Sequence, residues 1–317
     1  MLTEEVKKAL KNYDEILGIV LDQKIDEFSD RLDEAPPEDD DITYETYLQK
    51  EAMREADEQG RLMEDEPNDL LGGKSMNEYF RSLSFDELKE ILEYCATELD
   101  RGVPDSVTGA FASLDDRDGV REYARSVVND AAWTDEELKD EDKLFETEFQ
   151  KVRACFKVLS GTGDDSLVEE VLDRFMSYPA TRDFVADSIA EYIESFPDTA
   201  VPLIISRLDE KKDDGLTGPC EDLVIILTNI GKKEPSEEIY NALRSAFRYM
   251  ENKIYAVICL ADYGDQRAVP MLKSYINRHQ TTITRNLFYE MMSAIQNLGG
   301  DISDISDPFG DFQKKFK

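Results

Sequence analysis

The stretches Ala200-Val201-Pro202 and Ala268-Val269-Pro270 repeat one tripeptide 68 residues apart, in the part of the chain that decides the fold. Around them, residues that interrupt helices recur at 33 to 35 residue intervals, at Phe196-Pro197-Asp198, Ile230-Gly231, Tyr263-Gly264-Asp265 and Leu298-Gly299-Gly300. A period of this length accommodates two helices and two turns, which is the repeating unit of an α-solenoid. The spacing therefore predicts a stack of helix pairs over residues 161–300.

The chain before these repeats is also predicted to be helical. Apolar residues at steps of three and four from Val6 to Leu32 indicate one long amphipathic helix. The run 33–41, with two prolines and many carboxylates, indicates an exposed linker. Ser75 with Glu78, and Ser84 with Glu87, fit the capping box that begins a helix.

These patterns predict an all-α chain, because no Asn-Gly or Asp-Gly hairpin flanked by alternating β-branched residues occurs. They divide it into an acidic helical segment (1–63), a helical region (64–160), the repeat array (161–300) and a C-terminal tail (301–317). The region 64–160 holds either further degenerate repeats or a separate cap. The tail is expected to be a loose extension or a cap.

The segment Tyr263 to Leu272, YGDQRAVPML, resembles the junction between the two helices of HEAT-like repeats of the phycobilisome-lyase type. In that junction an apolar residue and Gly close one helix, Asp caps the next, and Ala-Val-Pro opens it. The segment Phe196 to Pro202 is a second copy that lacks the Gly and is one residue shorter. The resemblance covers about residues 180–298 and implies a right-handed solenoid whose second helices line a concave face. It does not imply lyase activity, because the repeat name describes architecture alone.

The composition limits the classes of partner. A net charge of −34, from 71 acidic and 37 basic residues, argues against direct binding to nucleic acid or to anionic membranes. The N-terminus has no basic region followed by an apolar core, and no apolar run is long enough to cross a membrane. Four widely spaced cysteines without a C-x-x-C motif indicate buried thiols in a reducing compartment. A cytoplasmic protein is therefore expected.

Motifs that carry chemistry are not found. The one histidine, His279, closes a predicted helix, where contact with the helix dipole is expected rather than catalysis. A calcium loop around Gly119 fails, because Leu114 and Arg125 occupy the positions that require acidic ligands. No P-loop, H-E-x-x-H or G-x-S-x-G motif occurs. We therefore expect neither a cofactor nor a metal, and no enzymatic activity, although the many carboxylates leave carboxylate-based catalysis open.

What remains is a set of cations on the predicted second helices, 198–209, 236–250 and 266–279. On the middle helix Arg244 and Arg248 are predicted to be exposed one turn apart, and Arg207 and Lys273 occupy analogous positions. Two interpretations stay open for this predicted ladder of four cations. It consists of ordinary surface ion pairs, or it is a docking strip for an acidic peptide, which includes this chain's own N-terminal segment.

Two functions follow as hypotheses. The first is a non-enzymatic scaffold that binds a protein or peptide on the concave face of the solenoid. The alternative is an acidic decoy that imitates nucleic acid and occupies a basic protein.

Overall fold

The computed structural model describes residues 2–33, 55–56, 58–131, 142–177, 183–310 and 312, and within these ranges the chain is helical and contains no strand beyond isolated bridges. The prediction of an all-α chain is confirmed. The predicted linker 33–41 lies outside the described residues from position 34 onwards. The chain divides into two compact units, residues 1–164 and 165–317, with a boundary close to the predicted start of the repeat array at residue 161.

The N-terminal unit contains six numbered α-helices, one 3-10 helix and a further helical segment at residues 58–65 among its described residues. The numbered elements are α1 (Glu4–Asp33), η1 (Asp69–Leu71), α3 (Met76–Phe80), α4 (Phe85–Glu98), α5 (Asp105–Ala112), α6 (Arg117–Asp130) and α7 (Asp142–Thr162). Both predicted capping boxes are present, because Ser75 and Ser84 each accept from the amide of the Glu three residues later, and that Glu accepts from the backbone of the Ser.

Helix α7 is the centre of this unit, since α4, α5 and α6 all pack against it. The first half of α1 is buried within the same unit through Val6, Ala9, Leu10 and Tyr13. The carboxylate of Asp14 accepts from the backbone amides of residues 100 and 101 at 3.0 and 2.8 Å. The first half of α1 therefore packs with the region that follows it.

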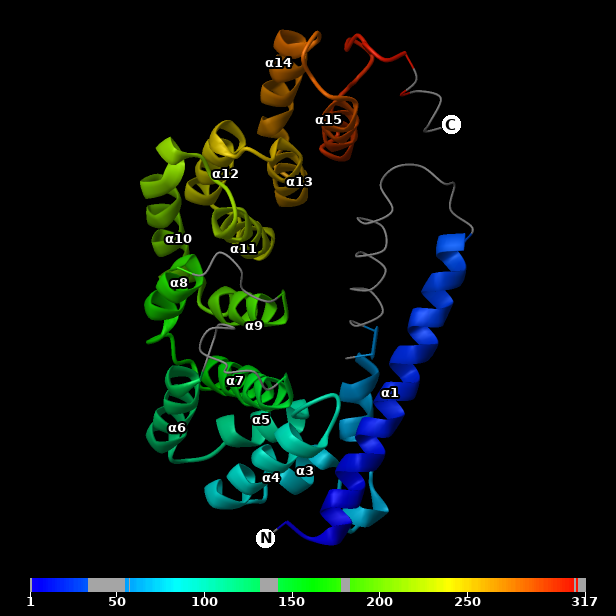
Figure 1. Cartoon of the computed structure of the whole chain (residues 1–317), viewed down its shortest axis with the longest axis vertical. Coiled ribbons are helices and arrows are strands. Elements are labelled where there is room, and N and C mark those ends of the chain that lie inside the picture. The colour runs from blue at the N-terminus through cyan, green and yellow to red at the C-terminus, as the bar shows by residue number, and fades with distance from the viewer. Residues whose placement is uncertain are drawn as a thin grey trace. The chain divides into compact units, whose positions relative to one another are not determined.

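The C-terminal unit alternates helices and turns as the repeat predicted (Figure 1). Its elements are α8 (Val168–Ser177), α9 (Asp183–Glu194), α10 (Pro197–Lys211), η2 (Lys212–Asp214), α11 (Pro219–Lys233), α12 (Glu237–Tyr249), α13 (Lys253–Tyr263), η3 (Gln266–Ala268), α14 (Val269–His279) and α15 (Arg285–Asn297).

These helices pack in two rows. In one row α9 contacts α11, α11 contacts α13 and α13 contacts α15, and in the other α8 contacts α10 and α10 contacts α12. Figure 1 shows α10, α12 and α14 along one side of this unit and α11, α13 and α15 along the other. Each odd-numbered helix also packs on a neighbour in the sequence, so helices of the two rows contact each other.

The junction before α14 forms as its sequence indicates. Gly264 ends α13 in the left-handed conformation, with φ of 82°, and the carboxylate of Asp265 accepts from the amide of Arg267. Pro270 lies in the first turn of α14, where the missing N–H leaves no helical hydrogen bond unmade.

The copy around Ala200 behaves differently, because α10 begins at Pro197 and places Pro202 in its interior. The prediction that Ala200-Val201-Pro202 opens the helix was wrong. Proline at the first helical position supplies an earlier start, and Asp198 accordingly lies in the first turn without capping the helix.

The prediction of a helix interruption at Gly231 was also wrong, because α11 continues through it to Lys233. Gly231 is buried, and a Cβ atom placed on it would lie 2.6 Å from the ring of Tyr263 and 2.9 Å from Cγ2 of Ile239. The absence of a side chain is therefore needed for close packing of α11 against the Tyr263 ring and α12, and not for a turn.

We expect Gly231→Ala to lower the free energy of unfolding by about 1–3 kcal/mol, the usual cost of overpacking. The control is Gly109→Ala in α5, where no heavy atom lies within 4 Å of the added Cβ. That control should gain up to about 1 kcal/mol from helix propensity. Urea unfolding followed by circular dichroism measures both, and a Gly231→Ala variant as stable as the wild type would contradict the packing argument.

Candidate functional site

A basic groove lies between α12 and α14 in the C-terminal unit. It has a volume of about 590 Å³. Its cationic lining residues come from η2, α12, α13 and α14, and they are Lys212, Arg244, Arg248, Lys253 and Arg278. His279 of α14 also lines it. None of the described residues that line this groove is Asp or Glu, although acidic residues outnumber basic ones 71 to 37 in the chain.

Three arginines carry the charge that the groove presents. Arg244 and Arg248 are exposed one turn apart on α12, as the sequence predicted, and Arg278 reaches the groove from α14. Arg244 donates to the Asn241 amide oxygen at 3.4 Å and Arg278 donates to the Ser274 hydroxyl at 2.5 Å, which are neutral partners. No described carboxylate forms an ion pair with these three guanidinium groups.

The two lysines of the groove have structural partners. Lys253 donates to the backbone carbonyls of Arg248 and Met250 at 2.9 and 2.5 Å, so it caps the C-terminal end of α12. Burial lowers the pKa of Lys253 below its ordinary value. Lys212 pairs with Asp209 at 3.1 Å, a hydrogen bond that raises its pKa. The arginines are therefore the cations left to meet a ligand.

Aromatic side chains join the two helices at the base of the groove. Phe247 of α12 meets Tyr275 of α14 edge to face with ring centroids 5.3 Å apart. Tyr275 in turn stacks on His279 at 4.0 Å. His279 Nδ1 lies 2.8 Å from the carbonyl of Tyr275, and because a carbonyl only accepts, Nδ1 is the donor in this contact. His279 thus occupies the end of α14, as predicted.

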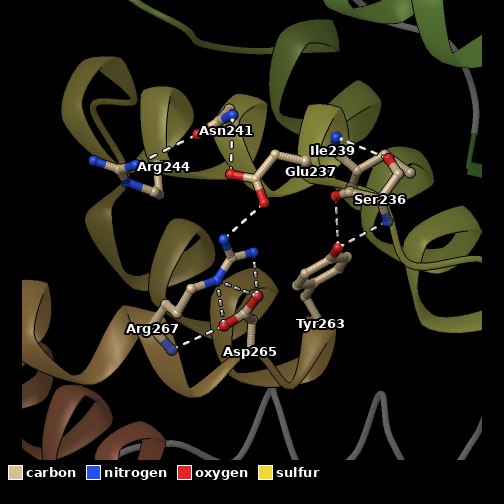
Figure 2. Close-up of polar contacts among 8 residues, drawn as sticks. All are labelled: Ser236, Glu237, Ile239, Asn241, Arg244, Tyr263, Asp265 and Arg267. Atoms are coloured by element: carbon tan, nitrogen blue, oxygen red, sulfur yellow. Dashed lines mark hydrogen bonds and ion pairs between the residues drawn. The ribbon is translucent and has the colours of Figure 1, made fainter.

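A polar network fixes the wall that carries Arg244 (Figure 2). Arg267 bonds the Asp265 carboxylate through Nε and Nη2 at 2.9 and 2.7 Å, and it reaches Glu237 of α12 at 2.7 Å. These bonds raise the pKa of Arg267 and lower that of Asp265. Glu237 accepts from Asn241 at 3.4 Å, and Asn241 accepts from Arg244. The junction before α14 is thereby linked to the groove.

Tyrosines reinforce the same wall. The Tyr263 hydroxyl donates to the carbonyl of Ser236 at 2.8 Å and accepts from its amide at 3.1 Å (Figure 2). The ring of Tyr263 stacks on that of Tyr240. The centroid of the Tyr240 ring lies 4.0 Å from the guanidinium carbon of Arg267 and 5.7 Å from that of Arg244. Burial raises the pKa of both tyrosines, so both stay protonated and able to donate at neutral pH.

A second hollow of about 350 Å³ lies between α10 and α12. Ile205, Leu208 and Leu216 supply apolar walls, and two carboxylates, Asp209 and Glu238, also line it. Asn241 and Ser245 line both hollows, so the two adjoin across α12, but the second hollow carries acidic groups where the first carries basic ones.

The other two predicted site residues lie elsewhere. Arg207 pairs with Asp173 of α8 at 2.8 Å, and Lys273 pairs with Asp304 at 2.6 Å. The hydrogen bond to Asp173 raises the pKa of Arg207. The structure thus places Arg244 and Arg248 together on the groove, whereas Arg207 and Lys273 form ion pairs and are not among its lining residues.

Sequence reasoning missed Arg278, Tyr275 and the lysines. A signal for the α14 residues was available, because Met271, Ser274, Tyr275 and Arg278 follow the spacing of one helical face. This face lines the groove, whereas Lys273 lies off it. The positions of Lys212 and Lys253 depend on the turns that follow α10 and α12, and the repeat does not specify the geometry of those turns.

The His, Cys, Asp and Glu side chains are also candidates for metal ligands, and the cysteines for reactive thiols. Within the described ranges, no group of three or more His, Cys, Asp or Glu side chains is arranged to hold a metal ion. All four cysteines are buried and free, and burial raises the pKa of Cys155 to about 12 and of Cys259 to about 11, so both thiols stay protonated.

Among the residues that the structure describes, no helix is long and apolar enough to span a membrane. Comparisons of the chain with family models, with curated proteins and with solved structures found no match.

Proposed function

We propose that the C-terminal unit is a HEAT-like repeat array that binds an acidic segment of a partner protein in the groove between α12 and α14. The observation that carries this proposal is the carboxylate-free lining of that groove in a chain of net charge −34. The two rows of alternating helices and the capped junction at Gly264 support the repeat architecture. The protein acts as a scaffold and catalyses no reaction.

The groove matches an acidic peptide better than an isolated anion. Guanidinium groups bind carboxylates through two parallel hydrogen bonds, and Arg244, Arg248 and Arg278 offer several such donors along the groove. The aromatic base formed by Phe247 and Tyr275 suits an apolar side chain between the acidic ones. The adjoining hollow between α10 and α12 is lined by Asp209 and Glu238, so the acidic segment is expected to stay on the α14 side of α12.

Charge reversal at α12 tests this proposal. A fluorescein-labelled peptide of alternating Glu and Phe should bind the full chain, and Arg244→Glu with Arg248→Glu should weaken it about tenfold or more. Both side chains are exposed and free of ion pairs with described carboxylates, so the melting temperature should not fall. Fluorescence anisotropy gives the affinity and calorimetry the stability.

The matched control is Arg81→Glu with Arg117→Glu, which changes the net charge equally at exposed arginines of the N-terminal unit. An equal loss of affinity in this control would assign binding to the overall charge and contradict the groove. The decoy hypothesis makes the opposite prediction, because a basic protein that binds the acidic surface should be retained by the α12 variant and released in moderate salt.

A further inference from the structure

A cavity of about 230 Å³ lies within the N-terminal unit. Its walls are α1, the helical segment 58–65, the turn at residues 100–104 and α7. An apolar cavity of roughly 150 Å³ already admits benzene. This cavity is therefore large enough for an organic molecule somewhat larger than one aromatic ring.

Part of the wall is apolar. Leu17 and Leu21 lie on α1, Val103 on the turn, and Ala154 on α7. The small side chains of Ala56 and Ala154 are buried, and Gly60, also buried, lies beside the Tyr13 ring with no side chain of its own. This wall suits a ring or a branched alkyl group.

Three carboxylates line the cavity, and two of them, Glu64 and Asp105, have partners. The buried Glu64 carboxylate accepts from the Tyr13 hydroxyl at 2.7 Å, from the Asp105 amide at 3.3 Å and from the Ser106 amide. Asp105 pairs with Lys157 at 2.6 Å and with Arg61 at 3.5 Å. Glu64 and Asp105 are therefore committed to α5 and α7, and the third carboxylate, Asp100, is exposed at the edge of the cavity.

Two cations at the cavity remain. Arg101 is held through its backbone amide by Asp14 at 2.8 Å, and its guanidinium lies against Gly18 of α1. Arg153 projects from α7, one turn before Lys157. No described carboxylate forms an ion pair with either guanidinium, although residues 1–100 contain 30 acidic residues against 11 basic ones.

We propose that this cavity binds a small organic anion, a carboxylate with an aromatic or branched apolar body, whose charge meets Arg101 and Arg153. The apolar body lies against Leu17, Leu21 and Val103. Charge-assisted hydrogen bonds from guanidinium to carboxylate select the anion, and the size of the cavity limits its body.

The test uses the full chain and 4-(trifluoromethyl)benzoate, observed by ¹⁹F NMR. The carboxylate should bind, and its neutral isostere, 4-(trifluoromethyl)benzamide, should bind about tenfold more weakly or not at all. Arg153→Ala and Arg101→Ala should each reduce affinity for the carboxylate about tenfold and leave affinity for the amide unchanged. Arg81→Ala, at an exposed arginine outside the cavity, should change neither.

Three results would overturn the proposal. The first is no binding of the carboxylate at millimolar concentration, and the second is equal binding of acid and amide. The third is binding that survives Arg101→Ala and Arg153→Ala but is lost in Arg244→Ala with Arg248→Ala, which would place the anion in the C-terminal groove. Circular dichroism confirms that each variant is folded, since both cavity arginines are at least partly exposed.

Discussion

Replacing Glu64 with leucine is expected to lower the free energy of unfolding of the N-terminal unit by about 3 kcal/mol or more. The carboxylate is 2% exposed and accepts from Tyr13 and from the first two amides of α5. Helix α5 has Pro104 as its N-cap and no side-chain cap of its own, so Glu64 satisfies these amides from a distant part of the chain. Leucine would remove the acceptor that these three donors share.

Hydrogen exchange distinguishes loss of the cap at the start of α5 from destabilisation of the whole N-terminal unit. The amides of Asp105 and Ser106 should lose protection first in Glu64→Leu. Tyr13→Phe removes one donor and leaves the carboxylate bonded to α5, so it should cost only about 1 kcal/mol. If Glu64→Leu and Tyr13→Phe were equally stable, the capping role of Glu64 would be wrong.

The same residue gives a pH dependence with a definite sign. Burial raises the pKa of Glu64 in the folded chain above its unfolded value, so the native state holds the proton more tightly. The stability of the wild type relative to Glu64→Gln should therefore increase as pH falls from the folded pKa towards the unfolded value, near 4.5. Below that pH the difference should stay constant. Urea unfolding of both proteins across this range measures it.

We expect Phe312→Ala to lower the free energy of unfolding by about 3 kcal/mol, because the variant loses a buried ring. Phe312 is 2% exposed and meets Phe288 and Tyr289 of α15 at centroid distances of 6.3 and 5.5 Å. The Asp307 carboxylate accepts from the Phe312 amide at 3.0 Å, and this bond holds the Phe312 backbone beside α15. Of the two predicted roles for the tail, the described residues support a cap over α15.

Phe312→Leu is the matched control, because it keeps an apolar side chain and should cost less than about 1.5 kcal/mol. Thermal unfolding compares the variants, and exchange of the α15 amides locates the effect. A loose tail would instead make both variants equal to the wild type.

The helices were largely predictable because their determinants are local. Serine caps, a left-handed Gly264 and apolar residues at steps of three and four act within a few residues of the helix that they define. Gly231 shows where local reasoning ends. Its identity follows from a ring at position 263, and no pattern near position 231 indicates that contact.

The candidate site was predictable only in part for the same reason. Arg244 and Arg248 share a helical face that periodicity alone locates. The partners of Arg207 and Lys273 are Asp173 and Asp304, which lie 34 and 31 residues away, and among so many carboxylates the sequence does not indicate which one pairs. Glu64, in the N-terminal unit, went unnoticed because its role depends on an α5 helix start 41 residues later.

Polar contacts in the C-terminal unit also carry a mechanical consequence. Thr199 bonds Asp165 across 34 residues, Asn229 bonds Glu194 across 35, and Arg267 bonds Glu237 across 30. Each link ties a helix only to its near neighbours, so tension applied along the unit passes from one link to the next. Only the link from Arg267 to Glu237 joins two charged groups, and both are exposed, so salt should weaken this link and leave the two with neutral donors nearly unchanged. Under load the unit should therefore give way first at the junction between α12 and α14 when the ionic strength is high.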